Sequence, residues 1–286
     1  MCLVALAIDP EERFPLVVAS NRDEYFDRPA APLAWWRRAP GETPILSGRD
    51  LLSGGTWLGL SSAGRLALLT NLRGAAPVDT QAPSRGAIVP AWLAGHEPTD
   101  QFWMRCALSG HNGFNLVAAD FSSAECFWAS NHGAHPKRLA KGVYGLSNAG
   151  LDTPWPKVQM LKERLRVALT VAVSAEALAQ RLFDALADRA VAPDANLPAT
   201  GVPIDWERRL SAAFIASPER RYGTRCSTVV ITERTSGATV THLWERSFDA
   251  DGNVLATRRS SLRGWPNPQE GGGADACIRD AAVTEA

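Results

Sequence analysis

Residues 1–24 read MCLVALAIDPEERFPLVVASNRDE, and this stretch sets the framework for the rest of the chain. Two short apolar runs, residues 3–8 and 16–20, flank an acidic turn that contains proline, a pattern typical of a β-hairpin. With the turn centred near residues 11–13, paired positions sum to about 24, so Cys2 is expected opposite residue 22. The hairpin therefore predicts that the polar cluster of residues 21–24 lies beside the first cysteine.

Both apolar runs are continuous rather than alternating, which indicates that other layers cover both faces of their sheet. Residues 24–54, with four prolines, are expected to form an ordered loop with short strands. Further strands are expected at residues 57–60, 66–70, 114–119, 125–129, 143–148, 226–232, 238–248 and 254–258. Helices are expected at residues 84–94, 99–108, 155–172, 175–187 and 204–216. Strands, then helices, then strands predict an α+β fold, a four-layer αββα sandwich.

Composition limits the class of protein. The chain has 286 residues, 45% of them hydrophobic, with 30 basic and 30 acidic side chains. A net charge of zero without a basic run argues against nucleic acid as a partner. No apolar run approaches the roughly twenty residues of a membrane span, so no stable membrane insertion is expected. We expect one domain over residues 1–262 and a disordered tail over residues 263–286, which is poor in large apolar side chains.

Cysteine usage indicates the compartment. The five cysteines are odd in number, scattered, and never spaced as a CxxC pair: Cys2, Cys106, Cys126, Cys226 and Cys277. This pattern predicts reduced thiols in a cytoplasmic protein rather than a disulfide framework. Cys126, His132 and His135 have metal-ligand chemistry but irregular spacing and no evident fourth ligand, so no metal site is predicted.

Cys2 is the first candidate for chemistry. If Met1 is removed, Cys2 carries both a thiol, with a pKa near ~8.5, and an α-amine, with a pKa near ~7.7 to 8.0. The amine can accept the thiol proton, so one residue supplies the nucleophile and the base. The alternative is that Cys2 is only a small buried hydrophobic residue.

Four other residues could complete a site for amide chemistry. Asp23 can orient the new amine, and Asn148 and Asn71, each at the end of an apolar strand, can donate to an oxyanion. Arg225 can supply positive charge near a thiolate or bind a substrate carboxylate. The alternatives are an ion-pair turn at residues 21–24, turn-forming asparagines, and a surface ion pair at Arg225.

Substrate contacts are predicted around the same cluster. Asn21 and Arg22 belong to it, and Asn71 is a second strand-end amide. Trp57 is one of ten tryptophans, most of which are expected in the core while some could line an apolar pocket. A small-molecule ligand or substrate is therefore predicted, and the sequence does not specify an oligomeric state.

Several motifs occur in an order that resembles the NRDE family, which includes the transport and Golgi organisation protein 2 homologues. They are Met1-Cys2, Asn21-Arg22-Asp23-Glu24, the segments 55–59, 70–73, 84–86, 112–115, 145–148 and 152–157, and Tyr222-Gly223-Thr224-Arg225. The resemblance covers residues 1 to about 260. The family is similar to N-terminal nucleophile hydrolases such as penicillin V acylase and bile salt hydrolase, which implies the αββα sandwich.

The resemblance also bears on single residues. In those hydrolases an Arg-Asn-x-Asp motif follows the N-terminal cysteine, and Ser20-Asn21-Arg22-Asp23 looks like its counterpart, with Asp23 matching the aspartate. Ser20 stands where the arginine is expected, and Arg22 lies two residues later. Asn148 and Arg225 resemble the later asparagine and arginine of the acylase site.

Two functions follow. The first is an N-terminal cysteine amide hydrolase, with no required cofactor, acting on a non-peptide C–N bond of a small amphipathic substrate. The second is a non-catalytic protein that binds or traffics haem, acyl-CoA or lipid, as the family resemblance implies. The sequence has no CxxCH motif for covalent haem, so haem would be a non-covalent ligand.

Overall fold

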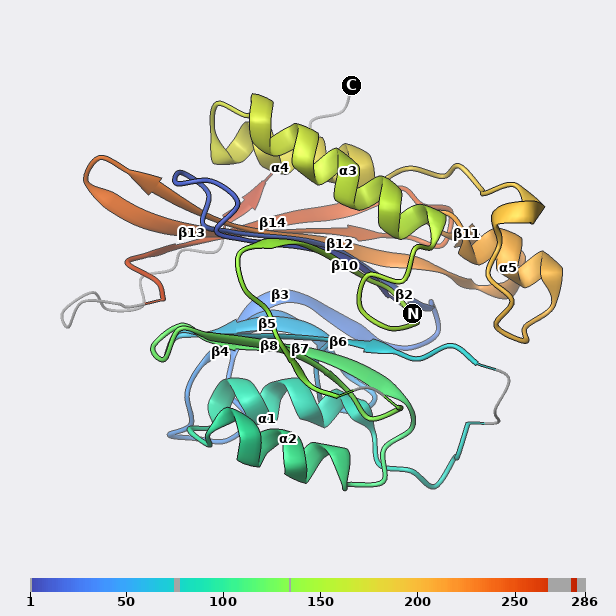
Figure 1. Cartoon of the computed structure of the whole chain (residues 1–286), viewed down its shortest axis with the longest axis horizontal. Coiled ribbons are helices and arrows are strands. Elements are labelled where there is room, and N and C mark those ends of the chain that lie inside the picture. The colour runs from blue at the N-terminus through green and yellow to red at the C-terminus, as the bar shows by residue number, and fades with distance from the viewer. Residues whose placement is uncertain (1, 75–77, 134, 267–278, 282–286) are drawn as a thin grey trace. The chain divides into compact units, whose positions relative to one another are not determined.

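The computed structural model describes residues 2–74, 78–133, 135–266 and 279–281. The chain forms two compact units. Unit 1 holds residues 2–27, 141–263 and 279–281, and unit 2 holds the described residues of 28–140 together with 264–266. Each unit contains one antiparallel sheet and its own helices (Figure 1).

The sheet of unit 1 runs in the order β10-β1-β2-β12-β13-β14-β15, with β11 paired to β12. All of its neighbouring strands are antiparallel. Its strands are β1 (Cys2–Ile8), β2 (Leu16–Tyr25), β10 (Gly142–Leu146), β11 (Ala216–Ser217), β12 (Tyr222–Thr235), β13 (Ala238–Phe248), β14 (Val254–Arg263) and β15 (Arg279–Ala281). The first strand of the chain is therefore an interior strand, between β10 and β2.

The register of the first hairpin confirms the sequence prediction, because Cys2 lies directly opposite Arg22. Asp9, at φ 44°, begins the turn, and its N–H donates to the carbonyl of Pro15 at 2.7 Å. Arg13, in the same turn, forms an ion pair with Glu233 of β12 at 2.6 Å. The turn is thereby fixed to the neighbouring strand.

The helices α3 (Pro156–Val171) and α4 (Ala175–Leu186) cover one face of this sheet. Unit 1 also contains α5 (Ile204–Leu210) and the short 3-10 turns η2 (Asp194–Asn196) and η3 (Pro218–Arg220). Proline suits the first position of α3, and the Ser174 side chain caps α4 by accepting from Ala177 N. Leu3, Ala5 and Ala7 of β1 join the core formed with α3 and α4. By alternation, Cys2 lies on the opposite face of the sheet.

The sheet of unit 2 is a meander in the order β3-β4-β5-β6-β7-β8-β9. Its strands are β3 (Ala30–Trp36), β4 (Ile45–Asp50), β5 (Leu58–Ser61), β6 (Arg65–Asn71), β7 (Phe114–Asp120), β8 (Glu125–Ser130) and β9 (Lys137–Arg138). The helices α1 (Ile88–Ala94) and α2 (Thr99–Ala107) follow the 3-10 turn η1 (Arg85–Ala87) and lie on one face of the sheet (Figure 1). Trp92 and Phe102 from these helices fill the core against β6, β7 and β8.

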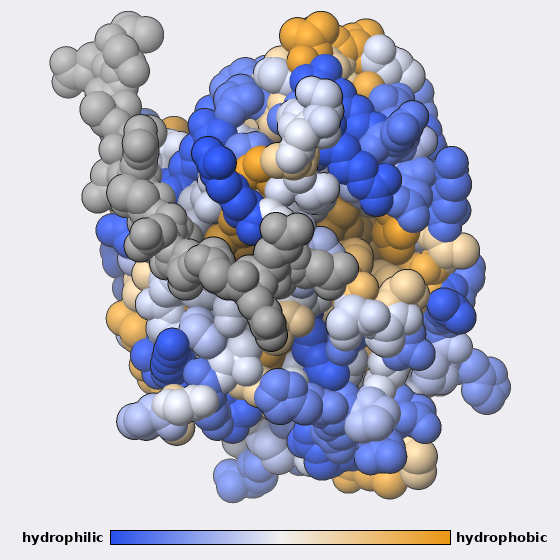
Figure 2. Space-filling model, turned by 90° about the vertical axis from the view of Figure 1, so that its left-hand side faces the viewer, coloured by the Kyte–Doolittle hydropathy of each residue, from blue (hydrophilic) through white to orange (hydrophobic). Residues whose placement is uncertain are grey.

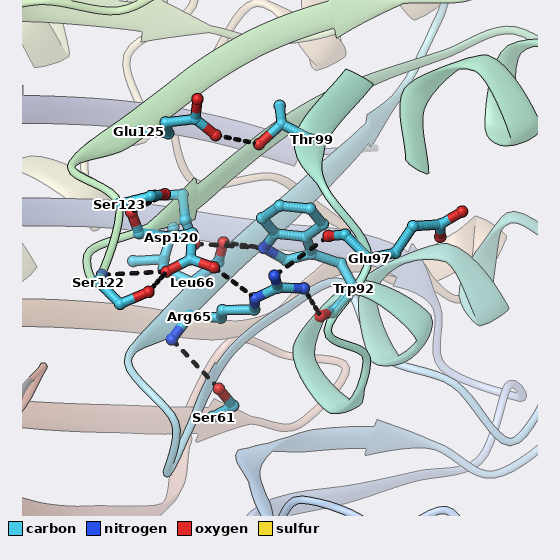
Figure 3. Close-up of polar contacts among 11 residues, drawn as sticks. Ser61, Arg65, Leu66, Trp92, Glu97, Thr99, Asp120, Ser122, Ser123 and Glu125 are labelled. Carbon is cyan, nitrogen blue, oxygen red and sulfur yellow. Dashed lines mark hydrogen bonds and ion pairs between the residues drawn. The ribbon is translucent and has the colours of Figure 1, made fainter. Parts of the chain in front are cut away.

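A buried arginine holds unit 2 together (Figure 3). Arg65 at the start of β6 donates to Asp120 at the end of β7 at 2.8 Å, and to the carbonyls of Trp92 and Glu97 at 3.3 and 3.1 Å. Its guanidinium also lies over the Trp92 ring, 4.2 Å from the ring centroid. Arg65 therefore connects two strands, α1 and the segment that follows α1.

Close backbone approach explains two of the sequence motifs in unit 2. Thr56 N donates to the carbonyl of Gly86, and a Cβ on Gly55 would lie 1.9 Å from that carbonyl oxygen. The glycines of the 55–59 and 84–86 segments are thus needed for the two segments to meet.

The α+β class is confirmed, with two antiparallel sheets and two sets of helices. The expectation of one domain over residues 1–262 stays a prediction, because two compact units also occur within single domains built from two sheets. Trp265, inside the expected tail, is buried and donates from Nε1 to Ser61 O at 2.8 Å. Within the expected tail, Arg279–Ala281 forms β15, and residues 267–278 and 282–286 lie outside the described residues.

Within the described ranges, none of the helices is long and apolar enough to cross a membrane. The face drawn in Figure 2 is mostly hydrophilic, with hydrophobic patches between polar side chains.

Candidate active site

The site is built on a row of three residues that cross neighbouring strands of unit 1. Arg22 of β2 lies directly opposite Cys2 of β1 on one side and Cys226 of β12 on the other. Directly opposed residues of antiparallel strands project to the same face. The row is therefore thiol, guanidinium, thiol, on the face away from α3 and α4. All three residues are buried, and Cys2 is 7% exposed.

The thiol of Cys2 is held mainly in its neutral form. Burial is the main cause that raises its pKa. The positive charges of the amino terminus and of Arg22 lower the pKa, and the negative charges of Asp23 and Glu24 raise it. A buried thiol of this kind needs an adjacent base to become a nucleophile. The arrangement suits a nucleophile that is activated by its own α-amine.

Cys226 has a different character from Cys2. Burial is the largest cause that raises the pKa of its thiol well above 9.0, and Glu245 adds to this effect. Two strand spacings place its Cα about 10 Å from that of Cys2, beyond the roughly 7 Å that a disulfide can bridge. Cys226 is thus a neutral neighbour of Arg22 and not a disulfide partner of Cys2. The described cysteines, Cys2, Cys106, Cys126 and Cys226, are free thiols.

Asn148 lies at the other side of Cys2. The pairing of β1 with β10 includes Val4 opposite Leu146, and the same register continued by two residues places Asn148 next to Cys2. Ser147 Oγ donates to the Cys2 carbonyl at 2.9 Å and lies 3.3 Å from Asn148 Oδ1. The Asn148 side chain is fully buried, and its predicted role as an oxyanion donor stays a prediction.

The loop that carries Asn148 is closed by Asp152. Asp152 N donates to Gly145 O at 2.8 Å, and Gly145 N donates to Asp152 Oδ1 at 2.7 Å. Lys162 of α3 binds the same carboxylate oxygen. Asp152 adopts φ 57°, and a Cβ on Gly145 would lie 2.5 Å from Val158 Cγ1. These contacts fix the segment from residue 145 to residue 152.

Asp23 is buried. It follows Arg22 in β2, so its side chain starts on the face of the sheet opposite to that of Cys2. Its Oδ1 accepts from Thr224 Oγ1 at 2.7 Å, and its carbonyl accepts from the Tyr222 hydroxyl at 3.3 Å. That its carboxylate and the Cys2 sulfur line one pocket stays a prediction. The negative charge of Asp23 acts on Cys2, because it raises the pKa of the thiol. Asp23 is the β2 residue just beyond Arg22, which places it next to the position of the Cys2 amine. Its catalytic role stays a prediction.

Asn21 lies on the helix-covered face. Its Nδ2 donates to the carbonyls of Leu186 and Ala213 at 2.8 and 2.9 Å, and its Oδ1 accepts from Ser227 Oγ at 2.6 Å. The side chain is fully buried. These contacts give Asn21 a structural function in joining β2, β12 and the ends of two helical segments, and its predicted substrate contact stays untested.

Arg225 occupies a β-bulge between Thr224 and Cys226. Its Nη1 donates to the carbonyls of Tyr25 and Phe26 at 2.8 and 3.4 Å, and its guanidinium lies 4.9 Å from the centroid of the Phe26 ring. The arginine directly opposite Cys2 is Arg22. The predicted role of Arg225 stays a prediction, and Arg22 is a second arginine that could supply positive charge near the Cys2 thiol.

Asn71 and Trp57 belong to unit 2. Asn71 ends β6 opposite Phe114, and the carbonyl of Trp57 accepts from Leu69 N at 2.8 Å. Their predicted role in the same site as Cys2 stays a prediction.

Two residues of the site were not singled out from the sequence. Ser147 lies inside the 145–148 motif, in which only the final asparagine is predicted to act, and Cys226 is one of five scattered thiols. Cys226 stands at the start of an apolar run, which indicates a strand. The sequence does not show that this strand pairs with β2, because the two strands are far apart in the chain. Within the described part of the chain, no group of three or more His, Cys, Asp or Glu side chains is placed to hold a metal ion.

Comparison with known proteins identifies the family. Residues 1–250 match the model of the Transport and Golgi organisation 2 family, and the chain belongs to this family. It is 33% identical to the Transport and Golgi organization protein 2 homolog of Bos taurus, over 94% of this chain and 96% of the relative. The identity to the Homo sapiens homolog is 32%, over 92% and 94%, and to the Drosophila melanogaster protein 28%, over 82% and 88%.

Among solved structures, the chain is similar to a C2A mutant of conjugated bile acid hydrolase from Clostridium perfringens. The TM-score is 0.47 and the identity 8%, over 99% of this chain and 97% of the other. It is also similar to an N-acylethanolamine-hydrolyzing acid amidase orthologue from Caenorhabditis elegans, with a TM-score of 0.44 and 11% identity, over 80% and 92%. At this level of similarity, the proposals below depend on the chain's own residues.

Proposed function

We propose that the chain is an N-terminal cysteine hydrolase that cleaves a non-peptide amide of a small amphipathic substrate. The observation that carries the proposal is the placement of Cys2. It is the first residue of an interior strand, with Arg22 directly opposite on one side and the Ser147–Asn148 segment on the other. A free amine at Cys2 would be covalently attached to the nucleophile.

The proposed reaction uses groups that lie around Cys2. The Cys2 sulfur forms a bond to the substrate carbonyl carbon, and its proton passes to the α-amine. Asn148 donates to the oxyanion and Arg22 supplies positive charge. The tetrahedral intermediate then breaks its C–N bond, and the leaving amine takes the proton from the α-ammonium. Water attacks the thioester by the same route and releases the carboxylic acid.

A non-catalytic protein for haem, acyl-CoA or lipid is the alternative. Such a protein would use the fold without a free amine at residue 2, and ligand binding would survive loss of the thiol. A cytoplasmic location belongs to the hydrolase proposal, since the nucleophile requires a reduced thiol.

The test is intact-mass analysis of the purified protein after brief exposure to an activated acyl ester such as a p-nitrophenyl ester. An enzyme of this class lacks Met1 and gains one acyl group at Cys2, which hydroxylamine removes because it is a thioester. Cys2→Ala should not acquire the group. The proposal would be contradicted if the protein kept Met1 and was still acylated, or if Cys2→Ala was acylated to the same extent as the wild type.

Cys226→Ala is the matched control, because it removes a thiol from the other side of Arg22. Its acylation should equal that of the wild type, since the neutral Cys226 thiol is not the nucleophile. An absorbance shift on adding haem that persists in Cys2→Ala would favour the binding protein.

A further inference from the structure

The hydroxyl of Ser147 contacts both residues on which the proposed acylation depends. Ser147 Oγ donates to the Cys2 carbonyl at 2.9 Å and lies 3.3 Å from Asn148 Oδ1. Ser147 is 2% exposed, and Asn148 is fully buried. A serine hydroxyl has one hydrogen to donate, and the shorter of these two contacts is the one to Cys2. The mechanism proposed above gives Ser147 no role.

Cys2 is the first residue of β1, and its backbone is held differently on its two sides. Toward β2 the pairing includes Cys2 itself, which lies opposite Arg22. Toward β10 the pairing among the described residues ends two residues earlier, with Val4 opposite Leu146. The Ser147 hydroxyl therefore binds the Cys2 carbonyl just beyond the point where backbone pairing with β10 stops. The ends of strands are the parts that open most readily, so this bond holds a position that would otherwise be weakly fixed.

The segment that carries Ser147 is itself firmly attached. Asp152 and Gly145 exchange two hydrogen bonds across the loop, and Asp152 forms an ion pair with Lys162 of α3. The Ser147 hydroxyl is thus a fixed donor, and the Cys2 carbonyl is the group that it holds.

We infer that Ser147 is a positioning residue that fixes the peptide group of Cys2, so that the sulfur attacks the substrate carbonyl beside Asn148. This peptide group carries the Cα of Cys2, which bears the thiol and, once Met1 is removed, the amine. Without the hydroxyl, thiol and amine shift together, so proton transfer between them persists while the alignment with Asn148 is lost. A misplacement of about 1 Å can slow a reaction by roughly 10²-fold. The inference rests on the proposed function, because it adds a residue to that site.

Two reactions of the Cys2 thiol separate positioning from a merely structural role. In acylation by a p-nitrophenyl ester, the sulfur bonds to the carbonyl carbon through an oxyanion, the thiol proton passes to the amine, and p-nitrophenolate leaves. In alkylation by iodoacetamide, the thiolate sulfur bonds to the CH2 carbon and iodide leaves, without an oxyanion. We expect Ser147→Ala to slow acylation by about tenfold to 10²-fold without slowing alkylation. Stopped-flow release of p-nitrophenol measures the first rate, and peptide mapping of Cys2 measures the second.

Three further variants make the comparison specific to the hydroxyl. Ser147→Thr keeps the hydroxyl and should keep most of the acylation rate, whereas Ser147→Val has nearly the same shape without it and should be slow. These two variants decide the matter if Ser147→Ala fails to fold. Ser130→Ala is the matched control, because Ser130 is buried in unit 2 and its Oγ donates to the Phe114 carbonyl at 3.1 Å. It loses the same kind of bond and should be acylated at the wild-type rate.

The double variant Ser147→Ala/Asn148→Ala tests whether the two residues act together. Once Asn148 is absent, loss of Ser147 should add little, because residues that act through one another are not additive. The inference is overturned if Ser147→Ala is acylated at the wild-type rate, if acylation and alkylation slow by the same factor, or if the two substitutions multiply. A wild type that retains Met1 or forms no thioester contradicts the hydrolase proposal and the role of Ser147 with it, whereas the three results above contradict the role of Ser147 alone.

Discussion

Two buried arginines, one on each sheet, have contrasting surroundings. Arg65 in unit 2 meets oxygen atoms on several sides, from the Asp120 carboxylate and from two backbone carbonyls, and an indole ring lies beneath it (Figure 3). Arg22 in unit 1 has a thiol as its direct neighbour on each side. The first arrangement uses the arginine to connect elements of the fold, and the second places positive charge beside a reactive group.

Position, and not burial, distinguishes the two arginines, because both are less than a tenth exposed. Arg65 joins elements of unit 2, whereas Arg22 lies directly opposite Cys2. It follows that substitutions around Arg65 should act on stability, whereas substitutions around Arg22 should act on the chemistry of Cys2.

The largest effect is expected for Arg65→Leu. The substitution leaves the Asp120 carboxylate without its cation and removes donors from two carbonyls, so the free energy of unfolding should fall by about 3 to 5 kcal/mol. Urea unfolding followed by circular dichroism measures this change. Arg105→Leu is the control, since Arg105 forms an exposed pair with Glu97 and should cost less than about 1 kcal/mol. If the two variants lost the same free energy of unfolding, the structural role of Arg65 would be contradicted.

Asn148→Ala should act on the reaction. Loss of one oxyanion donor slows acylation by roughly 10²- to 10³-fold, which stopped-flow release of p-nitrophenol measures. Asn131→Ala provides the comparison in unit 2, because Asn131 Oδ1 accepts from Phe114 N at 2.8 Å and its Nδ2 donates to His111 O at 3.0 Å. Asn131→Ala should lower stability and leave acylation unchanged. A normal acylation rate in Asn148→Ala would contradict its proposed role.

The structural features that depend on residues close together in the sequence could be predicted. The turn at residues 9–15 fixed the hairpin register, so the pairing of Cys2 with Arg22 was predictable. Helix bounds were also close: the range 175–187 was expected and Ala175–Leu186 is found, because Ser174 caps the helix and its apolar spacing is regular. The 204–216 helix was overestimated, since α5 ends at Leu210 and the chain continues as irregular segments and β11.

Non-local pairing was not predictable. Nothing in the sequence indicates that β2 pairs with β12, and this pairing alone brings Cys226 beside Arg22. The bulge at Arg225 could not be predicted either, because one extra residue in a strand does not change the sequence pattern in a recognisable way. β3 and β4 were expected only as short strands inside a loop, since prolines and glycines interrupt residues 24–54.

The pH dependence of stability offers a smaller effect. Burial by itself raises the pKa of Asp120, but hydrogen bonds from Ser122 and the nearby Arg65 outweigh it and lower the pKa. A lowered pKa in the folded state contributes stability above the unfolded value of about 3.9, and this contribution is lost as the pH falls through the folded value. Asp120→Asn should therefore destabilise by about 1 to 2 kcal/mol at pH 7. The difference from wild type should shrink below about pH 4 in urea titrations, and a difference independent of pH would contradict this account.

Because β1 begins at residue 2 and its first side chain lies opposite Arg22, the choice of affinity tag matters for recombinant work. A tag fused ahead of Cys2 would convert the amine into an amide that can no longer take up a proton, and would leave polypeptide next to Asp23. Under the proposed mechanism, such a preparation would be inactive. Purification handles therefore belong at the carboxyl end, or must be removed so that cysteine becomes residue one.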